Sequence, residues 1–151
     1  MTLDGWTRVI ADSDHPGPAR VGRYGVDVAA IDALVERSLA AFSDVAVFLV
    51  DEVGKMECHS TVFVSAMRRL LASSTPLVAT VAERGGGFMA EVCGLRGAEL
   101  WTVTPQNRGA LPQRVLQWLG RGPGTAELGE LARMESEHMD RTELGLVQGL
   151  W

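Results

Sequence analysis

The chain has 151 residues, a length typical of one compact domain with a sizeable core. Hydrophobic residues make up 46% of it and charged residues 22%, a balance that excludes an intrinsically disordered chain. Its 14 basic and 19 acidic residues give a formal net charge of −5, so we expect no general nucleic-acid binding.

The sequence also shows no feature of a membrane or secreted protein. No run of about 18 apolar residues is present, and residues 1–5 lack the basic and apolar regions of a signal peptide. The two cysteines, Cys58 and Cys93, form no disulfide framework and are expected to be reduced thiols. We therefore expect a cytoplasmic protein that has no membrane partner.

The predicted elements begin with a hairpin and continue as alternating helices and strands. Two extended pieces, residues 6–11 and 19–24, are predicted to pair through a turn at the Pro-Gly-Pro segment 16–18. Apolar spacing then predicts helices over residues 27–42, 60–71, 88–92 and 111–119, with Asp27 and Ser60 as N-caps of the first two. Apolar runs predict buried strands over residues 45–50, 76–81 and 99–103.

This alternation predicts an α/β fold of three layers, with helices on both faces of a mainly parallel sheet. Residues 1–119 are predicted to form that domain. Residues 120–151 are predicted to form a glycine-rich hinge followed by an amphipathic helix and a loose tail.

Two carboxylates follow the first buried strand. Asp51 and Glu52 come directly after the apolar run 45–50, which is the Walker B pattern of P-loop hydrolases. In open α/β sheets, ligands bind at the carboxyl ends of the strands, so both side chains are expected at such a crevice. Asp51 would hold Mg²⁺ through water, and Glu52 would orient and deprotonate an attacking water. Taken alone, the strand and the two acids fit a solvated acidic turn better than a catalytic site.

The residues that follow narrow the choice. Residues 51–57 read D-E-V-G-K-M-E and resemble the signature of a family of small P-loop nucleoside-triphosphatases of archaea and bacteria, which also includes a human cancer-related enzyme. Three further segments resemble the same family in the same order: V-G-R-Y-G-V-D at 21–27, A-T-V with Arg84 at 79–84, and T-P-Q-N-R at 104–108. The resemblance spans about three quarters of the chain and does not cover the tail after Gly120.

The resemblance implies a RecA-like domain that hydrolyses Mg-bound ATP, GTP or other nucleoside triphosphates to diphosphate and phosphate. Asp51 would serve the metal and Glu52 the water. Lys55 and Arg84 would stabilise charge on the γ-phosphate, and Asn107 and Arg108 would contact the base or ribose. The alternatives for the basic residues are an exposed arginine at position 84 and an ion pair of Lys55 with Glu57.

One part of the family pattern is missing. A P-loop enzyme needs G-x-x-x-x-G-K-[S/T], but the only lysine, Lys55, lies in the loop after the two acids, and no Walker A motif occurs in the 151 residues. The first strand of the family, with its P-loop, would lie between the strands at 76–81 and 99–103. Its absence leaves sheet edges that a partner chain or a second copy would cover. Met1 is either an internal methionine of a longer enzyme or the start of a truncated one.

We therefore expect little or no activity from this chain alone, because positioning and electrostatics supply nearly all of this type of catalysis. The alternative function is a non-catalytic nucleotide-binding or protein-interaction subunit derived from the family. Two further features have simpler interpretations. We expect Thr80 to be a β-branched strand residue and not a polar sensor at the strand end. We expect the adjacent residues Cys58 and His59 to bind no metal.

Overall fold

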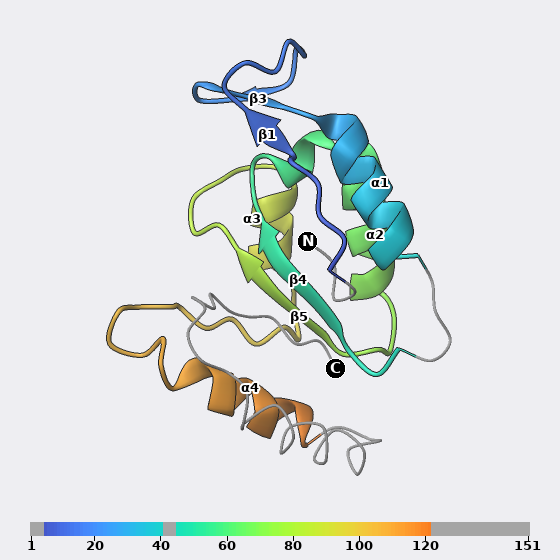
Figure 1. Cartoon of the computed structure of the whole chain (residues 1–151). Helices are drawn as coiled ribbons and strands as arrows, with labels where there is room; N and C mark the ends of the chain where they lie inside the picture. The colour runs from blue at the N-terminus through green and yellow to red at the C-terminus, as the bar shows by residue number, and fades with distance from the viewer. Residues whose placement is uncertain (1–4, 41–44, 122–151) are drawn as a thin grey trace.

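The computed structural model of the chain describes residues 5–40 and 45–121. Of the predicted hinge and tail at residues 120–151, only residues 120 and 121 are among those described. Figure 1 shows the two β-sheets of the described part at different heights, with the antiparallel sheet above the parallel one. No helix within the described ranges is long and apolar enough to cross a membrane.

The antiparallel sheet has the order β1-β3-β2 and lies at the start of the chain. Its strands are β1 (Ala11–Asp12), β2 (Arg20–Val21) and β3 (Tyr24–Val26). The predicted pairing of residues 6–11 with 19–24 is wrong, because β1 pairs with β3 and not with β2. Gly22, at a φ of +59°, turns the chain inside the second piece, so β2 and β3 form the hairpin with each other.

The parallel sheet pairs β4 (Phe48–Val53) with β5 (Leu77–Val81). The register sets Phe48 opposite Leu77 and Val50 opposite Ala79. β4 begins three residues later than predicted and extends through the two carboxylates. The pairing decides this boundary, because the Phe48 N–H donates to the carbonyl of Pro76 at 2.9 Å at the start of the ladder.

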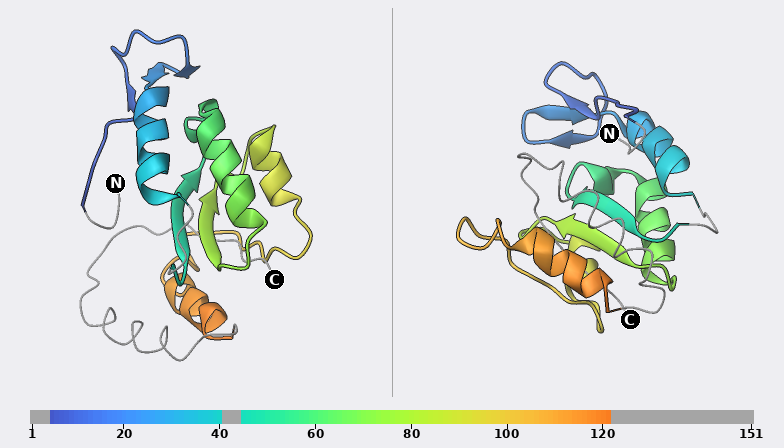
Figure 2. Two further views of the ribbon diagram at one scale, coloured as in Figure 1. Left: turned by 90° about the vertical axis from the view of Figure 1, so that its right-hand side faces the viewer. Right: turned by 60° about the horizontal axis from the view of Figure 1, so that its bottom comes forward.

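Helices cover both faces of this parallel pair (Figure 2). Alternate β5 residues face opposite ways: Leu77 and Ala79 belong to the core shared with α1 (Val28–Ser38), α2 (Thr61–Leu71) and α3 (Phe88–Cys93). Val78 instead packs with α4 (Leu111–Leu119) through Val115 and Trp118. All three β5 residues are buried, which confirms the predicted three-layer α/β arrangement with parallel strands.

The predicted caps start the first two long helices. The Asp27 carboxylate accepts a hydrogen bond from the Ala30 N–H at 2.9 Å, and Ser60 Oγ accepts one from the Phe63 N–H at 2.8 Å. Ser60 is fully buried, and its hydroxyl donates a short hydrogen bond to the carboxylate of Asp32 on α1. The N-cap residue of α2 is therefore hydrogen-bonded to α1. This contact fixes the end of the β4–α2 loop that leads into α2.

The predicted strand at residues 99–103 is wrong. Among the described residues no strand lies on the outer side of β5 to accept its hydrogen bonds, so this segment runs without strand structure. Local contacts of Trp101 hold it against α4. The Arg114 guanidinium lies 4.0 Å from the centre of the Trp101 ring, and the indole N–H donates to Glu99 at 3.1 Å.

Candidate active site

The two predicted carboxylates lie at an irregularity in the parallel sheet. The β4–β5 register shifts between Val50 and Val53, so Asp51 and Glu52 form a bulge at the carboxyl end of β4. Glu52 has a φ of 77°, the one positive φ of a non-glycine residue in the described ranges. Both side chains are exposed. The bulge therefore places two carboxylates in solvent near the end of β4. The prediction that this strand is buried throughout is wrong, because Phe48 and Val53 are buried but Leu49 is 56% exposed.

Thr80 on β5 holds this bulge. The Glu52 N–H donates a 2.7 Å hydrogen bond to Thr80 Oγ1, and the Thr80 hydroxyl donates to Asp51 Oδ1 at 3.4 Å. One hydroxyl therefore contacts both residues of the acidic pair. Thr80 was predicted to be a simple strand residue, but its side chain stabilises an unusual backbone conformation from the neighbouring strand.

A third carboxylate approaches Glu52 above Gly54. A Cβ placed on Gly54 would lie 2.5 Å from Glu52 Oε1 and 2.8 Å from Glu57 Oε2, so the two oxygens occupy the space that glycine leaves open. Glu57 belongs to η1 (Glu57–His59), a 3₁₀ turn whose Cys58 N–H donates to the Gly54 carbonyl at 3.1 Å. This tight turn folds the chain back onto itself.

Glu57 is a member of the site that was predicted only as a partner for Lys55. Burial raises the pKa of the half-buried Glu57 carboxyl, and the negative charges of Glu52 and Asp51 raise it further. Backbone hydrogen bonds at Glu57 and Gly54 act in the opposite direction. The available signal was its place in the D-E-V-G-K-M-E segment, five residues after Glu52 across a glycine turn.

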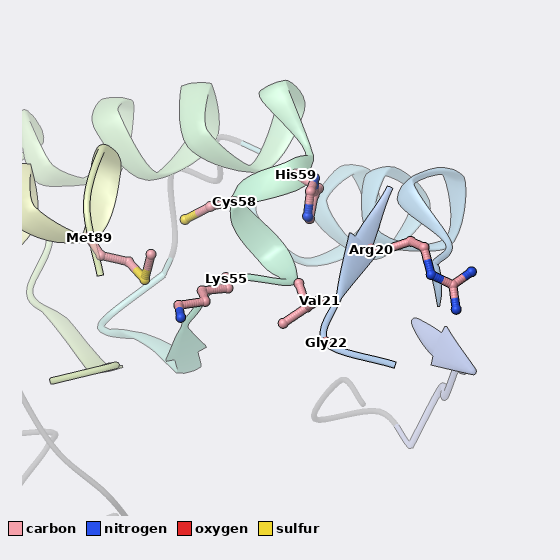
Figure 3. Close-up of a pocket in the computed structure, with 7 residues that line it drawn as sticks. All are labelled: Arg20, Val21, Gly22, Lys55, Cys58, His59 and Met89. Atoms are coloured by element: carbon pink, nitrogen blue, oxygen red, sulfur yellow. The ribbon is translucent and has the colours of Figure 1, made fainter. Parts of the chain in front are cut away.

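Lys55 is exposed. It lines a hollow of about 400 Å³ between the β2–β3 turn and η1, shown in Figure 3. The predicted alternative of an ion pair with Glu57 is not found: within the described part of the chain, no salt bridge involves Lys55. Arg84 is exposed in the loop between β5 and α3 and makes no hydrogen bond or ion pair with any described residue.

Asn107 shapes its own loop. Its Oδ1 accepts a hydrogen bond from the Thr104 N–H at 2.8 Å, and its Nδ2 donates to the Thr102 carbonyl at 2.8 Å. The Arg108 N–H donates to the Thr104 carbonyl at 3.0 Å, which completes the turn and leaves the Arg108 side chain exposed. The Asn107 amide therefore orders the segment that presents Arg108.

The donor set at the bulge suits a magnesium ion better than a metal that needs several protein ligands. No group of three or more His, Cys, Asp or Glu side chains close enough to hold a metal occurs in residues 5–40 and 45–121. Mg²⁺ binds through one or two carboxylates and keeps several waters, which the exposed Asp51 carboxylate can satisfy.

Comparison with known proteins gives concordant matches. The model of the family described as NTPase matches residues 1–116. The nucleoside-triphosphatase THEP1 of Thermotoga maritima is 30% identical over 120 residues, which cover 79% of this chain and 69% of that protein. THEP1 of Thermofilum pendens is 38% identical over 102 residues, covering 66% of this chain and 56% of that protein. The crystal structure of THEP1 from Aquifex aeolicus aligns with a TM-score of 0.70 and 30% identity, over 78% of this chain and 73% of that one.

Proposed function

The chain belongs to this NTPase family of P-loop nucleoside-triphosphatases, and we propose that it carries the hydrolytic half of a site that cleaves a Mg-bound nucleoside triphosphate to diphosphate and phosphate. The observation that carries the proposal is the bulge, which sets Asp51 and Glu52 side by side at the carboxyl end of the parallel strand β4. Ligands of open α/β sheets bind at such strand ends.

Asp51 is the residue that would hold Mg²⁺ in this site. Its exposed carboxylate supplies the hard oxygen ligand that the ion prefers, with waters and substrate phosphates as the remaining ligands. When bound, the ion would neutralise phosphate charge that develops during transfer. The Thr80 hydroxyl, 3.4 Å from Asp51 Oδ1, limits the orientations of that carboxylate.

Glu52 is the residue that would orient the attacking water and accept its proton. Its backbone is fixed in the left-handed region by the hydrogen bond to Thr80, and its carboxylate lies above Gly54 beside Glu57. The fixed backbone limits the region that the Glu52 carboxylate can reach, which favours placement of a water near the substrate. The proposed role follows from that fixed position and from general base chemistry.

Basic residues would complete the site. Lys55, three residues after Glu52, and Arg84, in the loop after β5, are exposed cations that could approach a γ-phosphate. Arg108 would contact the base or ribose from the 104–108 turn, with Asn107 ordering that turn through its amide. Nucleoside triphosphate and Mg²⁺ are therefore the proposed ligands.

We further propose that the 151 residues alone release phosphate slowly or not at all. No Walker A motif occurs in them, so the backbone N–H groups and the lysine that cradle the phosphates are missing. The same feature favours the second candidate function, a non-catalytic nucleotide-binding or protein-interaction subunit. In that case the carboxylate of Glu52 would have no bearing on function.

The test is phosphate release from Mg-ATP and Mg-GTP by the purified chain, with Glu52→Gln as the matched control. We expect release near the background rate, equal in both proteins. Rapid release that disappears in Glu52→Gln would mean that the phosphates are held without a Walker A motif. Another chain or another loop would then have to supply the groups that hold them. Rapid release that persists in Glu52→Gln would overturn the role of Glu52.

A further inference from the structure

The outer edge of β5 carries backbone groups that have no partner in the described part of the chain. At the start of the ladder the Phe48 N–H donates to the Pro76 carbonyl, and Phe48 lies opposite Leu77. A parallel pair uses the backbone of alternate residues on each strand, so the N–H and C=O groups of Leu77 and Ala79 point away from β4. No described strand lies on that side, and no described residue bonds these backbone groups.

These backbone groups are buried. Counted with its backbone, Leu77 is 4% exposed and Ala79 is 2% exposed. Their side chains lie in the core shared with α1, α2 and α3, while Val78 between them packs with α4 on the other face (Figure 2). Buried backbone groups are almost always paired, because burial removes the water that would otherwise bond them. The edge is therefore expected to pair with a further strand.

The chemistry of this edge favours an uncharged, apolar strand. Residues 76–81 carry no charged side chain, and helices cover both faces of β5 (Figure 2). A strand added beside β5 would lie near the same two helical layers, and strands buried on both faces are nearly continuous apolar runs. A charged side chain would lose its hydration there without gaining an ionic partner, because the edge supplies none.

Three stretches lie outside the described residues, and one of them contains a segment with this chemistry. Residues 1–4 and 41–44 each end in an aspartate and are too short to cover the edge from Leu77 to Val81. Residues 144–151 read L-G-L-V-Q-G-L-W and contain no charged side chain. This segment is the longest uncharged run after α4, and it is long enough to pair along the whole edge.

The chain leaves the described part close to this edge. It does so at Arg121, shortly after α4, and α4 packs against Val78 of β5 through Val115 and Trp118. Residues 122–143 would span up to about 70 Å when extended, which exceeds the diameter of a domain of this size. Because the segment is tethered to the same chain, its effective concentration at the edge is far above that of a second copy in dilute solution.

We propose that residues 144–151 add a strand to the β4–β5 sheet, paired with the outer edge of β5 through the N–H and C=O groups of Leu77 and Ala79. The segment thereby supplies partners for buried backbone groups that the described residues leave unpaired. This inference is independent of the proposed function, because it involves neither the acidic pair nor a nucleotide.

The experiment is NMR spectroscopy of the isotope-labelled full chain. Nuclear Overhauser effects are expected between the backbone protons of Ala79 and those of residues 144–151, together with slow solvent exchange of the Leu77 and Ala79 amide protons. Val147→Asp places a charge in the middle of the added strand. It should abolish these contacts and speed the exchange of both amides at least about tenfold, because their hydrogen bonds are lost.

The matched control is Leu128→Asp, which adds the same charge to the tail outside the added strand and should leave contacts and exchange unchanged. Near-ultraviolet circular dichroism checks that each variant is folded, and the contacts in the unchanged chain test the pairing without any variant. Contacts of Ala79 seen only between differently labelled molecules would identify a second copy as the partner and overturn the proposal. Rapid exchange of both amides in the unchanged chain, or slow exchange without contacts to residues 144–151, would also overturn it.

Discussion

The backbone N–H of Glu52 donates a 2.7 Å hydrogen bond to the hydroxyl of Thr80, a residue 28 positions later on the neighbouring strand. This bond crosses the bulge in β4 and holds Glu52 at a φ of 77°. The geometry of the acidic pair is therefore determined by β5 as well as by the strand that carries it.

Replacing Thr80 tests this bond. In Thr80→Val the Glu52 N–H loses its acceptor while the shape of the side chain is kept, so the free energy of unfolding should fall by about 1 kcal/mol. Thr80→Ser keeps the hydroxyl and should recover most of that loss. Urea denaturation of the three proteins measures both effects. Equal stability of the Val and Ser variants would show that the hydrogen bond contributes nothing.

The backbone of Glu52 makes a second prediction. A φ of 77° is costly for any residue with a Cβ and not for glycine, so Glu52→Gly should be about 1 kcal/mol more stable than Glu52→Ala. Both variants remove the same carboxylate, so the difference between their free energies of unfolding isolates the backbone. An alanine variant as stable as the glycine variant would contradict a strained conformation at this position.

Two glycines should respond differently to alanine. A Cβ on Gly54 would meet only the ends of the Glu52 and Glu57 side chains, which can move, so Gly54→Ala should cost less than about 1 kcal/mol. A Cβ on Gly25 would lie 2.5 Å from the backbone oxygen of His15, which is harder to displace. Gly25→Ala should cost about 1–3 kcal/mol. Thermal or urea unfolding of both variants checks the order, and the reverse order would be inconsistent with this packing.

The half-buried carboxyl of Glu57 predicts a pH dependence of stability. Its pKa is raised in the folded chain above the ordinary value of 4.5, so the folded state binds the proton more tightly than the unfolded state. The resulting stabilisation is complete below the unfolded pKa and is lost as the pH rises through the folded pKa. Glu57→Gln lacks this titration.

The measurement compares the urea midpoints of the unchanged chain and Glu57→Gln from about pH 4 to about pH 7. The midpoint of the Gln variant should rise relative to that of the unchanged chain as the pH increases. A constant difference across this range would mean that Glu57 titrates alike in the folded and unfolded states.

Local signals in the sequence predicted much of this fold. The caps Asp27 and Ser60 and the apolar faces of the helices they start depend on neighbours within one helical turn, and the structure confirms both caps. The acidic pair was also identifiable, since it directly follows an apolar run. These features need no knowledge of which strands pair.

Features that depend on distant partners were not predictable in the same way. The β1–β3 pairing and the hydrogen bond from Glu52 to Thr80 join segments that sequence patterns do not connect. The apolar character of residues 99–103 suggested a strand, but an apolar run forms a strand only where another strand accepts its hydrogen bonds. The sequence did not predict Glu57 as a neighbour of Glu52, because the two side chains come together only through the turn at Gly54.

The most direct test of the site is paramagnetic broadening by Mn²⁺, used in place of Mg²⁺ in the presence of ATP. Low levels of Mn²⁺ should broaden the amide NMR signals of Val53 and Thr80, which surround the bulge, and Asp51→Asn should abolish this effect. Asp12→Asn, which removes an exposed carboxylate on β1, should leave the broadening unchanged. Broadening that persists in Asp51→Asn, or that centres on residues away from the bulge, would contradict the proposed magnesium–nucleotide site.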